Sequence, residues 1–289
     1  MGEVVRSFAG ARADMDMQGV VSGLFVYPVK SCRGTAVQQA RLTERGLEYD
    51  RQWMVVDRGG RFVSQREVPE LALVVPALSA LGIELNAPRM NPLAVAFDTE
   101  GPLRSVSVWR DTVLAIDQGD EVANWLSEWV QREVRLVRFD PRVPRLCNPQ
   151  YAGATGAHTA FADGYPLLVI SEASLADLNA RLAEPLPMNR FRPNLVLSGI
   201  EAYDEDHIDE VRVGDIVAKL VKPCTRCRVT TTDQATAEVG PEPLATLALY
   251  RTSVRLDGVT FGVNAIVTGG VGATISLGQA ASCRFRFGD

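Results

Sequence analysis

The sequence predicts a mainly β fold of the α+β class, built as two β-barrel-like domains with a few peripheral helices. Short apolar or alternating runs recur along the chain, and turns that carry glycine or proline separate them, as in barrels and sandwiches. Few segments keep helical spacing. Helices and strands do not alternate as they do in a parallel α/β sheet.

The first half opens with an apolar strand over residues 20–29, which ends at a proline and a lysine–serine–cysteine turn. Residues 51–57 and 61–65 flank an Arg-Gly-Gly turn and predict a hairpin. Asp120 begins a helix whose apolar residues recur at helical spacing. The two prolines of residues 139–144 indicate a linker. We therefore expect an N-terminal domain over residues 18–140 and a second domain over residues 141–289.

The second half carries two further helix starts, at Ser171 and at Glu242, the latter with a proline tolerated in its first turn. Residues 211–213 and 216–221 flank a Gly-Asp pair and predict another hairpin. Residues 261–268 and 274–277 flank Gly-Gly and close the chain in β-structure.

Composition limits the function classes. The 289 residues are 46% hydrophobic and 22% charged, as in globular proteins. A net charge of −5 argues against a general nucleic-acid or anionic-membrane binder. No apolar run approaches the length of a membrane span, and residues 1–17 contain no apolar block of the signal-peptide type. Five scattered cysteines fit a reducing compartment, so we expect a cytoplasmic protein.

The segment with the most chemistry is a cysteine turn. Cys224 and Cys227 lie three residues apart among Lys222, Arg226 and Arg228. Neighbouring positive charge favours the thiolate, which is the reactive and metal-binding form of cysteine. A run of three threonines follows and favours extended backbone, so we expect the cysteines in a turn between two strands.

The spacing of these two cysteines leaves several interpretations open. A structural zinc site needs four ligands, and neither the other three cysteines nor the two histidines form a second pair. A thioredoxin-like redox pair would open a helix, whereas threonines follow here. Two buried cysteines that act as small hydrophobic residues are the remaining interpretation.

The residues around the cysteines add a resemblance. Residues 223–233 (PCTRCRVTTTD) resemble the signature of the MOSC family, the domain of molybdenum-cofactor sulfurases and of the mitochondrial amidoxime-reducing component and its bacterial relatives. Residues 27–34 (YPVKSCRG) and 50–57 (DRQWMVVD) look like landmarks of the associated N-terminal β-barrel domain. Further landmarks follow in family order at residues 171–175, 189–196, 213–215, 242–244 and 250–251. The resemblance runs from about residue 19 to about residue 278, and its landmarks are jointly specific.

The resemblance implies a molybdenum cofactor of the pyranopterin-dithiolene type. Cys227 falls at the position of the metal ligand, and soft thiolate suits such a metal. Inside the matched landmarks, the residues implied to bind the cofactor and its phosphate are Lys30, Ser31, Arg51 and Arg192. Glu201 falls where the family has an acidic residue near the metal, which implies a proton donor. Because these residues come from both halves, we expect the cofactor between two domains.

The implied activity is reduction of N-hydroxylated or N-oxide small molecules. The chain lacks the four-cysteine spacing of an iron–sulfur domain, so a separate flavin-, haem- or iron–sulfur-linked protein is expected to supply electrons. The alternative is a carrier of the cofactor, or of sulfur as a persulfide on Cys227 or Cys224, without reductase turnover. A metal-free β protein is the third hypothesis.

A few other residues carry weaker predictions. Arg66 is a minor candidate for the phosphate, and His158 for a substrate entrance. We expect His207 at the surface and Asp233 in hydrogen bonds with the cysteine turn. The four tryptophans, at positions 53, 109, 125 and 129, are predicted to be core residues.

Overall fold

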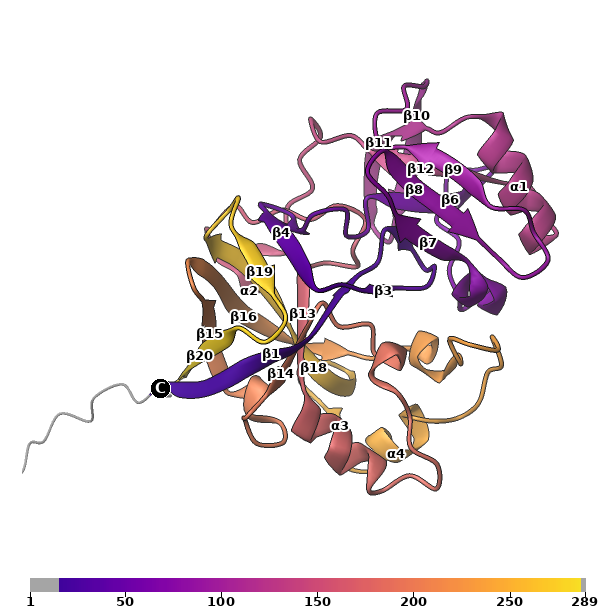
Figure 1. Ribbon diagram of the computed structural model, residues 1–289. Coiled ribbons are helices and arrows are strands. Elements are labelled where there is room, and N and C mark those ends of the chain that lie inside the picture. Colours follow the sequence, from indigo (N-terminus) through magenta and orange to yellow (C-terminus); the bar gives the residue numbers. More distant parts are fainter. Residues whose placement is uncertain (1–15, 287–289) are drawn as a thin grey trace, which may run out of the picture.

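The computed structural model describes residues 16–286 and consists mostly of strands, which confirms the mainly β class. Figure 1 shows two lobes, one built mainly from the first half of the chain and one mainly from the second. No targeting signal is predicted in residues 1–17, and residues 1–15 of that segment lie outside the described residues. Within residues 16–286, no helix is long and apolar enough to cross a membrane.

The second lobe is a closed barrel. Around the barrel the strands are β13 (Leu167–Ser171), β14 (Leu195–Ser198), β1 (Met17–Val26), β20 (Ala280–Phe285), β15 (Ile208–Val213), β16 (Ile216–Thr225) and β18 (Gly258–Gly269), which pairs back with β13. All these pairings are antiparallel except β13 with β14. Inward side chains of every barrel strand form one apolar core. The short strand β3 (Thr35–Ala36) pairs with the end of β1, and β17 (Thr252–Ser253) pairs with the start of β18.

The barrel takes β1 from the N-terminal segment and places it between β14 and β20. Another N-terminal strand, β4 (Gln39–Thr43), lies between β5 (Gly46–Leu47) and the C-terminal strand β19 (Thr274–Ser276). Strands from before residue 140 therefore help to build the second lobe. The division at residue 140 stays a prediction.

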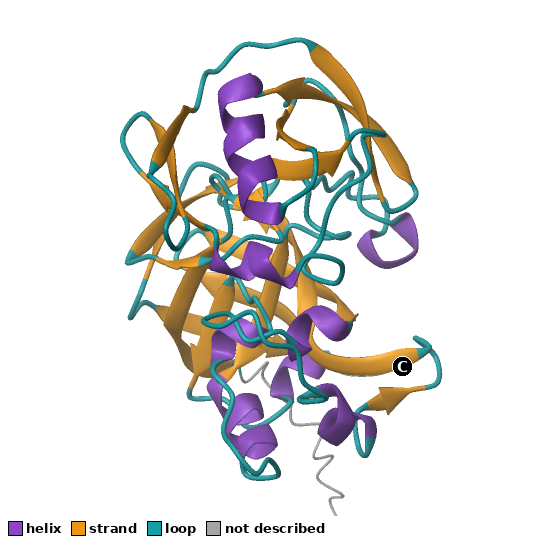
Figure 2. Cartoon of the chain, turned by 90° about the vertical axis from the view of Figure 1, so that its right-hand side faces the viewer, coloured by secondary structure: helices purple, strands orange, loops and turns teal. Residues whose placement is uncertain are grey.

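The first lobe has two sheets. One runs in the order β10 (Leu103–Val108), β11 (Asp111–Asp117), β12 (Val134–Phe139), β6 (Trp53–Asp57), β2 (Val29–Lys30). The other is β7 (Val75–Leu78), β8 (Gly82–Asn86), β9 (Leu93–Ala96). Helix α1 (Asp120–Val130) buries Val122, Trp125 and Leu126 in one core with residues of β2, β6, β8, β9 and β12. It is the long helix near the top of Figure 2.

The predicted helices begin close to where the sequence indicates. Besides α1, they are α3 (Glu172–Asn179) and α4 (Leu244–Ala248), and a fourth, α2 (Pro149–Ala152), was not predicted. Ser171 caps α3, since its hydroxyl accepts from the Ser174 N–H. Single 3₁₀ turns are η1 (Pro69–Leu73), η2 (Met188–Arg190), η3 (Asp204–Asp206) and η4 (Arg228–Thr231).

One predicted hairpin is only partly formed. The turn after β6 is present, and Asp57 N–H donates to the Arg61 carbonyl. The second strand, predicted over residues 61–65, is reduced to bridges, from Phe62 to Val56 and from Arg61 to Ser107. The Val63 N–H also donates to the Val55 carbonyl at 2.8 Å. Residues 61–63 therefore follow β6 as predicted, and only residues 64–65 of the predicted strand do not.

Candidate functional site

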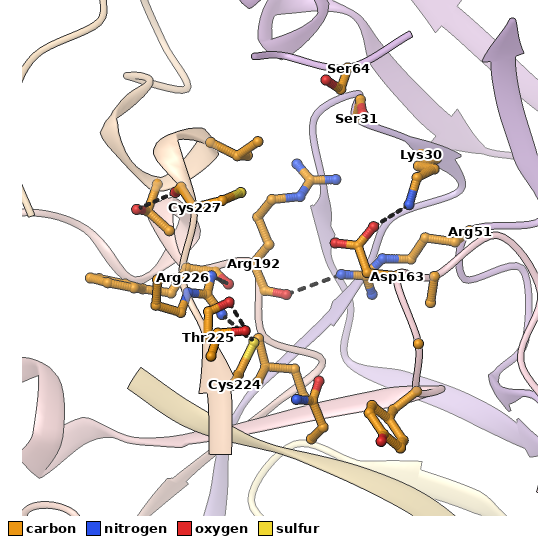
Figure 3. Close-up of a pocket in the computed structure, with 18 of the residues that line it drawn as sticks. Lys30, Ser31, Arg51, Ser64, Asp163, Arg192, Cys224, Thr225, Arg226 and Cys227 are labelled. Atoms are coloured by element: carbon orange, nitrogen blue, oxygen red, sulfur yellow. Dashed lines mark hydrogen bonds and ion pairs between the residues drawn. The ribbon is translucent and has the colours of Figure 1, made fainter. Parts of the chain in front are cut away.

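A cavity of about 140 Å³ lies between the two lobes and is lined by residues of both halves of the chain. Five predicted site residues line it together: Lys30, Ser31, Arg51, Arg192 and Cys227. Figure 3 shows Cys224 and Cys227 on one side, Lys30, Arg51 and Asp163 on the other, and Arg192 between them. Glu201 is exposed and is not among the lining residues.

The cysteine turn starts at the end of β16. Cys224 is still part of this strand, whereas Cys227 follows it and directly precedes η4. The expectation that the threonine run is extended is wrong, because Thr230 and Thr231 belong to the 3₁₀ turn. Their hydroxyls donate to the carbonyls of Cys227 and Arg228, three residues back. This local bonding outweighs the strand preference of β-branched residues.

The two cysteines differ in environment. Cys224 is partly buried, and its sulfur accepts a hydrogen bond of 3.0 Å from Arg226 Nη1. Arg226 Nη2 also donates to the Phe191 carbonyl at 2.6 Å. Cys227 is exposed, and within the described chain its sulfur has no hydrogen-bond partner. Cys227 is therefore the more available thiol.

Arg190 stabilises the cysteine turn through hydrogen bonds to backbone carbonyls, a role that the sequence did not indicate. Its buried guanidinium donates to the carbonyls of Thr230, at 2.9 Å, and Glu242, at 3.2 Å. Asp233 accepts from the backbone N–H groups of Ala235 and Thr236, so its hydrogen bonds stabilise the loop that follows the turn.

On the opposite wall, the ammonium of Lys30 is buried and paired with a carboxylate. Its Nζ donates to Asp163 Oδ1 at 2.5 Å and to the Phe161 carbonyl at 2.8 Å. Burial lowers the pKa of Lys30, and the Asp163 charge opposes that shift. The charge of Lys30 and the hydrogen bonds from Lys30 and Trp109 hold the pKa of the Asp163 carboxyl below its ordinary value.

Asp163 and Trp109 are lining residues that sequence reasoning missed. Trp109 was predicted to be core, but its side chain is 47% exposed, and Nε1 donates to Asp163 Oδ1 at 2.9 Å. Arg66 lies over the Trp109 ring, 4.3 Å from its centroid. The predicted minor candidate Arg66 thus does line the cavity, whereas His158 and His207 do not.

The charges around the cavity are unbalanced. The charged lining residues are Lys30, Arg51, Arg66, Arg192 and Arg226, with Asp163 as the acidic one. Asp50 pairs with Arg51 at 2.6 Å, just behind the wall. Within residues 16–286, no carboxylate forms an ion pair with Arg66, Arg192 or Arg226. Burial, and then the charge of Arg51, lower the pKa of Arg192 to about 10, so it stays charged at neutral pH. The cavity therefore favours an anion.

Hydrogen bonds between the halves of the chain hold the walls in place. Arg51 donates to Asn194 Oδ1 at 3.0 Å and to the Arg192 carbonyl at 3.2 Å, and Arg192 Nη1 donates to the Cys32 carbonyl at 2.7 Å. The buried amides of Gln65 and Gln234 bond each other reciprocally. They also donate to the carbonyls of Ser31 and Thr232. The cation-bearing wall and the cysteine turn are thus tied directly.

Comparisons with known proteins agree with the resemblance in the sequence. The model of the MOSC N-terminal beta barrel domain matches residues 18–133, and that of the MOSC domain matches residues 156–280. Mitochondrial amidoxime reducing component 2 of Rattus norvegicus is 37% identical, over 83% of this chain and 75% of that protein. Mitochondrial amidoxime-reducing component 1 of Homo sapiens is 35% identical, over 81% and 72%. Among solved structures, the YUAD protein from Bacillus subtilis aligns with 93% of this chain and 97% of that chain at 8% identity, with a TM-score of 0.41.

Proposed function

The chain belongs to the family of MOSC-domain proteins that includes the mitochondrial amidoxime-reducing components, and on this premise we propose that it is a molybdenum-cofactor-dependent reductase of N-hydroxylated compounds and N-oxides. The observation that carries the proposal is the cavity, which combines an exposed thiol with a surplus of cations. A molybdenum cofactor presents a soft, sulfur-bound metal at one end and a phosphate at the other. The metal end binds a soft thiolate, and the phosphate end binds cationic hydrogen-bond donors.

The donors of the cavity fit both ends. Cys227 offers a soft sulfur without a hydrogen-bond partner in the described chain. Arg192 and Arg226 carry charges that no carboxylate of the described chain neutralises. The Nε atom of Arg226 is buried and unpaired, and an unsatisfied buried donor costs roughly 1–3 kcal/mol unless a ligand or water accepts from it.

We assign the roles as follows. Cys227 binds the metal, and Lys30, Ser31, Arg51 and Arg192 hold the rest of the cofactor, with the phosphate on the arginines. When bound, the cofactor supplies a metal centre that exchanges electron pairs with the substrate. Asp163 orients Lys30, and Arg226 engages Cys224, which leaves Cys227 as the free thiol. We assign no step to Glu201, because it lies outside the lining residues.

A separate protein is proposed to deliver the electrons, through flavin, haem or an iron–sulfur centre. Three of the five cysteines, Cys32, Cys147 and Cys283, are buried and scattered, and residues 16–286 contain no group of three or more His, Cys, Asp or Glu side chains placed to hold a metal. Cytoplasmic location stays a prediction, since the relatives named above carry the word mitochondrial in their names.

Metal and pterin analysis of the protein from a cofactor-producing host tests the proposal. We expect near-stoichiometric molybdenum and pterin, and viologen-dependent reduction of benzamidoxime. We expect Cys227→Ala to lose most of its molybdenum and to have a turnover rate at least a hundredfold lower, with an unchanged melting temperature. Cys147→Ala, at a buried thiol outside the cavity, is the control. Wild-type protein without molybdenum, from cells in which another molybdoenzyme is loaded, contradicts the proposal.

The exposure of Cys227 also favours a second candidate function, a carrier of the cofactor or of persulfide sulfur, because an exposed thiol is accessible to a partner. The turnover assay separates the two. A carrier holds the cofactor, or sulfur on Cys227, and does not consume reduced viologen with amidoximes or hydroxylamines.

A further inference from the structure

Two cavity arginines share one aromatic ring behind the wall. The guanidinium carbons of Arg51 and Arg192 lie 4.2 Å and 4.3 Å from the centroid of the Tyr27 ring. Tyr27 is buried and is not itself among the lining residues. The electron-rich face of an aromatic ring attracts guanidinium groups, most strongly where water is excluded. The ring therefore offsets part of the repulsion between two neighbouring cations.

The backbone around Tyr27 fixes the ring. The Tyr27 N–H donates to Asp50 Oδ1 at 2.9 Å, and its carbonyl accepts from the Arg51 N–H at 2.7 Å. A Cβ atom added to Gly34 would lie 2.1 Å from Tyr27 Cε1. Only glycine fits at position 34 without moving the ring, so the ring has a defined place next to both arginines.

The hydroxyl group of Tyr27 does not explain its presence. This oxygen is buried and has no hydrogen-bond partner in the described chain. Burial raises the pKa of Tyr27 to about 12, so the side chain is a neutral phenol at physiological pH. The attraction between Tyr27 and the arginines is therefore a cation–π interaction of the ring and not an ion pair.

We propose that Tyr27 is a positioning residue whose ring fixes Arg51 and Arg192 as a receptor for a phosphate group. The inference rests on the proposed function only for the identity of the molecule that carries the phosphate. Asp50 neutralises Arg51 at 2.6 Å, whereas no carboxylate in residues 16–286 forms an ion pair with Arg192. A bound anion therefore balances chiefly the charge of Arg192, and the ring keeps Arg192 beside Arg51.

Binding of inorganic phosphate to the cofactor-free protein, measured by calorimetry, tests this. Tyr27→Phe keeps the ring and is expected to bind within twofold of wild type. Tyr27→Leu removes the ring, and we expect phosphate binding about tenfold weaker, as loss of two cation–π contacts implies. Gly34→Ala, which displaces the ring and leaves both arginines, is expected to weaken binding in the same direction. If Tyr27→Leu does not fold, Gly34→Ala takes its place as the test variant.

Trp125→Leu is the matched control, because Trp125 is a buried aromatic residue of α1 outside the cavity. We expect it to lower stability and leave phosphate affinity unchanged. Pterin content from a cofactor-producing host should follow the same order among the variants.

Three results overturn the inference: no phosphate binding by wild type, wild-type affinity in folded Tyr27→Leu, or equal losses in the Phe and Leu variants. If phosphate binding depends on the ring but wild type from a competent host holds no molybdenum, the inference stands and the proposed function fails.

Discussion

At the scale of single residues, Asp163 limits how strongly the cavity attracts anions. Its side chain is 71% exposed, pairs with Lys30 at 2.5 Å and faces a cavity whose other charged lining residues are all cations. The Lys30 ammonium is thereby largely neutralised. Arg66, Arg192 and Arg226, rather than Lys30, then carry most of the positive potential.

The substitution Asp163→Asn tests this balance. Removal of one negative charge beside Lys30 is expected to tighten binding of inorganic phosphate about three- to tenfold at low salt, and less at high salt. Asp111→Asn is the control, since Asp111 pairs with Arg145 and does not line the cavity. Calorimetric titration of the cofactor-free variants measures the effect. Unchanged or weaker binding by Asp163→Asn would show that the carboxylate does not oppose the anion.

The lining of the cavity was predictable where its residues lie in contiguous motifs. Lys30, Ser31 and Cys227 each fall inside a short pattern, and all three line the cavity. The contact of Lys30 with Asp163 joins residues 133 positions apart, and no local pattern carries that information. Glu201, which was assigned by family position and lies in none of these short patterns, does not line the cavity, and its role stays a prediction.

At the scale of elements, Asp117 joins three parts of the first lobe. Its buried carboxylate, at the end of β11, accepts from Arg104 of β10 and from Arg135 of β12, the latter at 2.6 Å and 2.8 Å. It also accepts from the Gly119 N–H at the start of α1, at 2.8 Å. Burial alone would raise the pKa of Asp117, but these hydrogen bonds lower it to about 2.

This pKa predicts how stability depends on pH. Because the folded value lies below the ordinary 3.8, the carboxylate stabilises the fold fully above about pH 4, and the contribution is lost as pH falls toward 2. Asp117→Asn is expected to lower the free energy of unfolding by about 2 kcal/mol at pH 7 and by much less near pH 2. Asp120→Asn, which removes an 86% exposed partner of the same Arg135, should cost less than about 0.5 kcal/mol. Urea unfolding at both pH values measures this, and equal losses at the two pH values would contradict it.

Elements with their own start signals were predictable, and elements shaped by tertiary bonding were not. Helix α3 begins after Ser171, whose hydroxyl caps it as the sequence indicates. The threonines after Cys227 look like strand residues, yet they form η4, and the guanidinium of the distant Arg190 holds the Thr230 carbonyl. Strand preference is too weak to prevail against such contacts.

At the scale of the whole molecule, the barrel depends on both ends of the chain. β1 lies between β14 and β20, and it buries Val21, Leu24 and Val26 in the barrel core. The same strand leads into Tyr27 and Lys30, so closing the barrel also brings the cation-bearing wall to the cysteine turn. Dividing the chain into domains by sequence pattern could not reveal this pairing of β1, because local periodicity carries no information on pairing between distant strands.

A fragment of residues 141–289 is therefore expected not to fold cooperatively by itself. It lacks β1, which leaves the edges of β14 and β20 unpaired, and it loses three buried side chains worth roughly 1.5–3 kcal/mol each. Adding a peptide of residues 16–43 should restore a cooperative thermal transition followed by near-ultraviolet circular dichroism. The same peptide with Leu24→Asp should not, because that carboxylate would enter the apolar core. Cooperative unfolding of the fragment without peptide would mean that β1 is dispensable and that residue 140 does separate two independent domains.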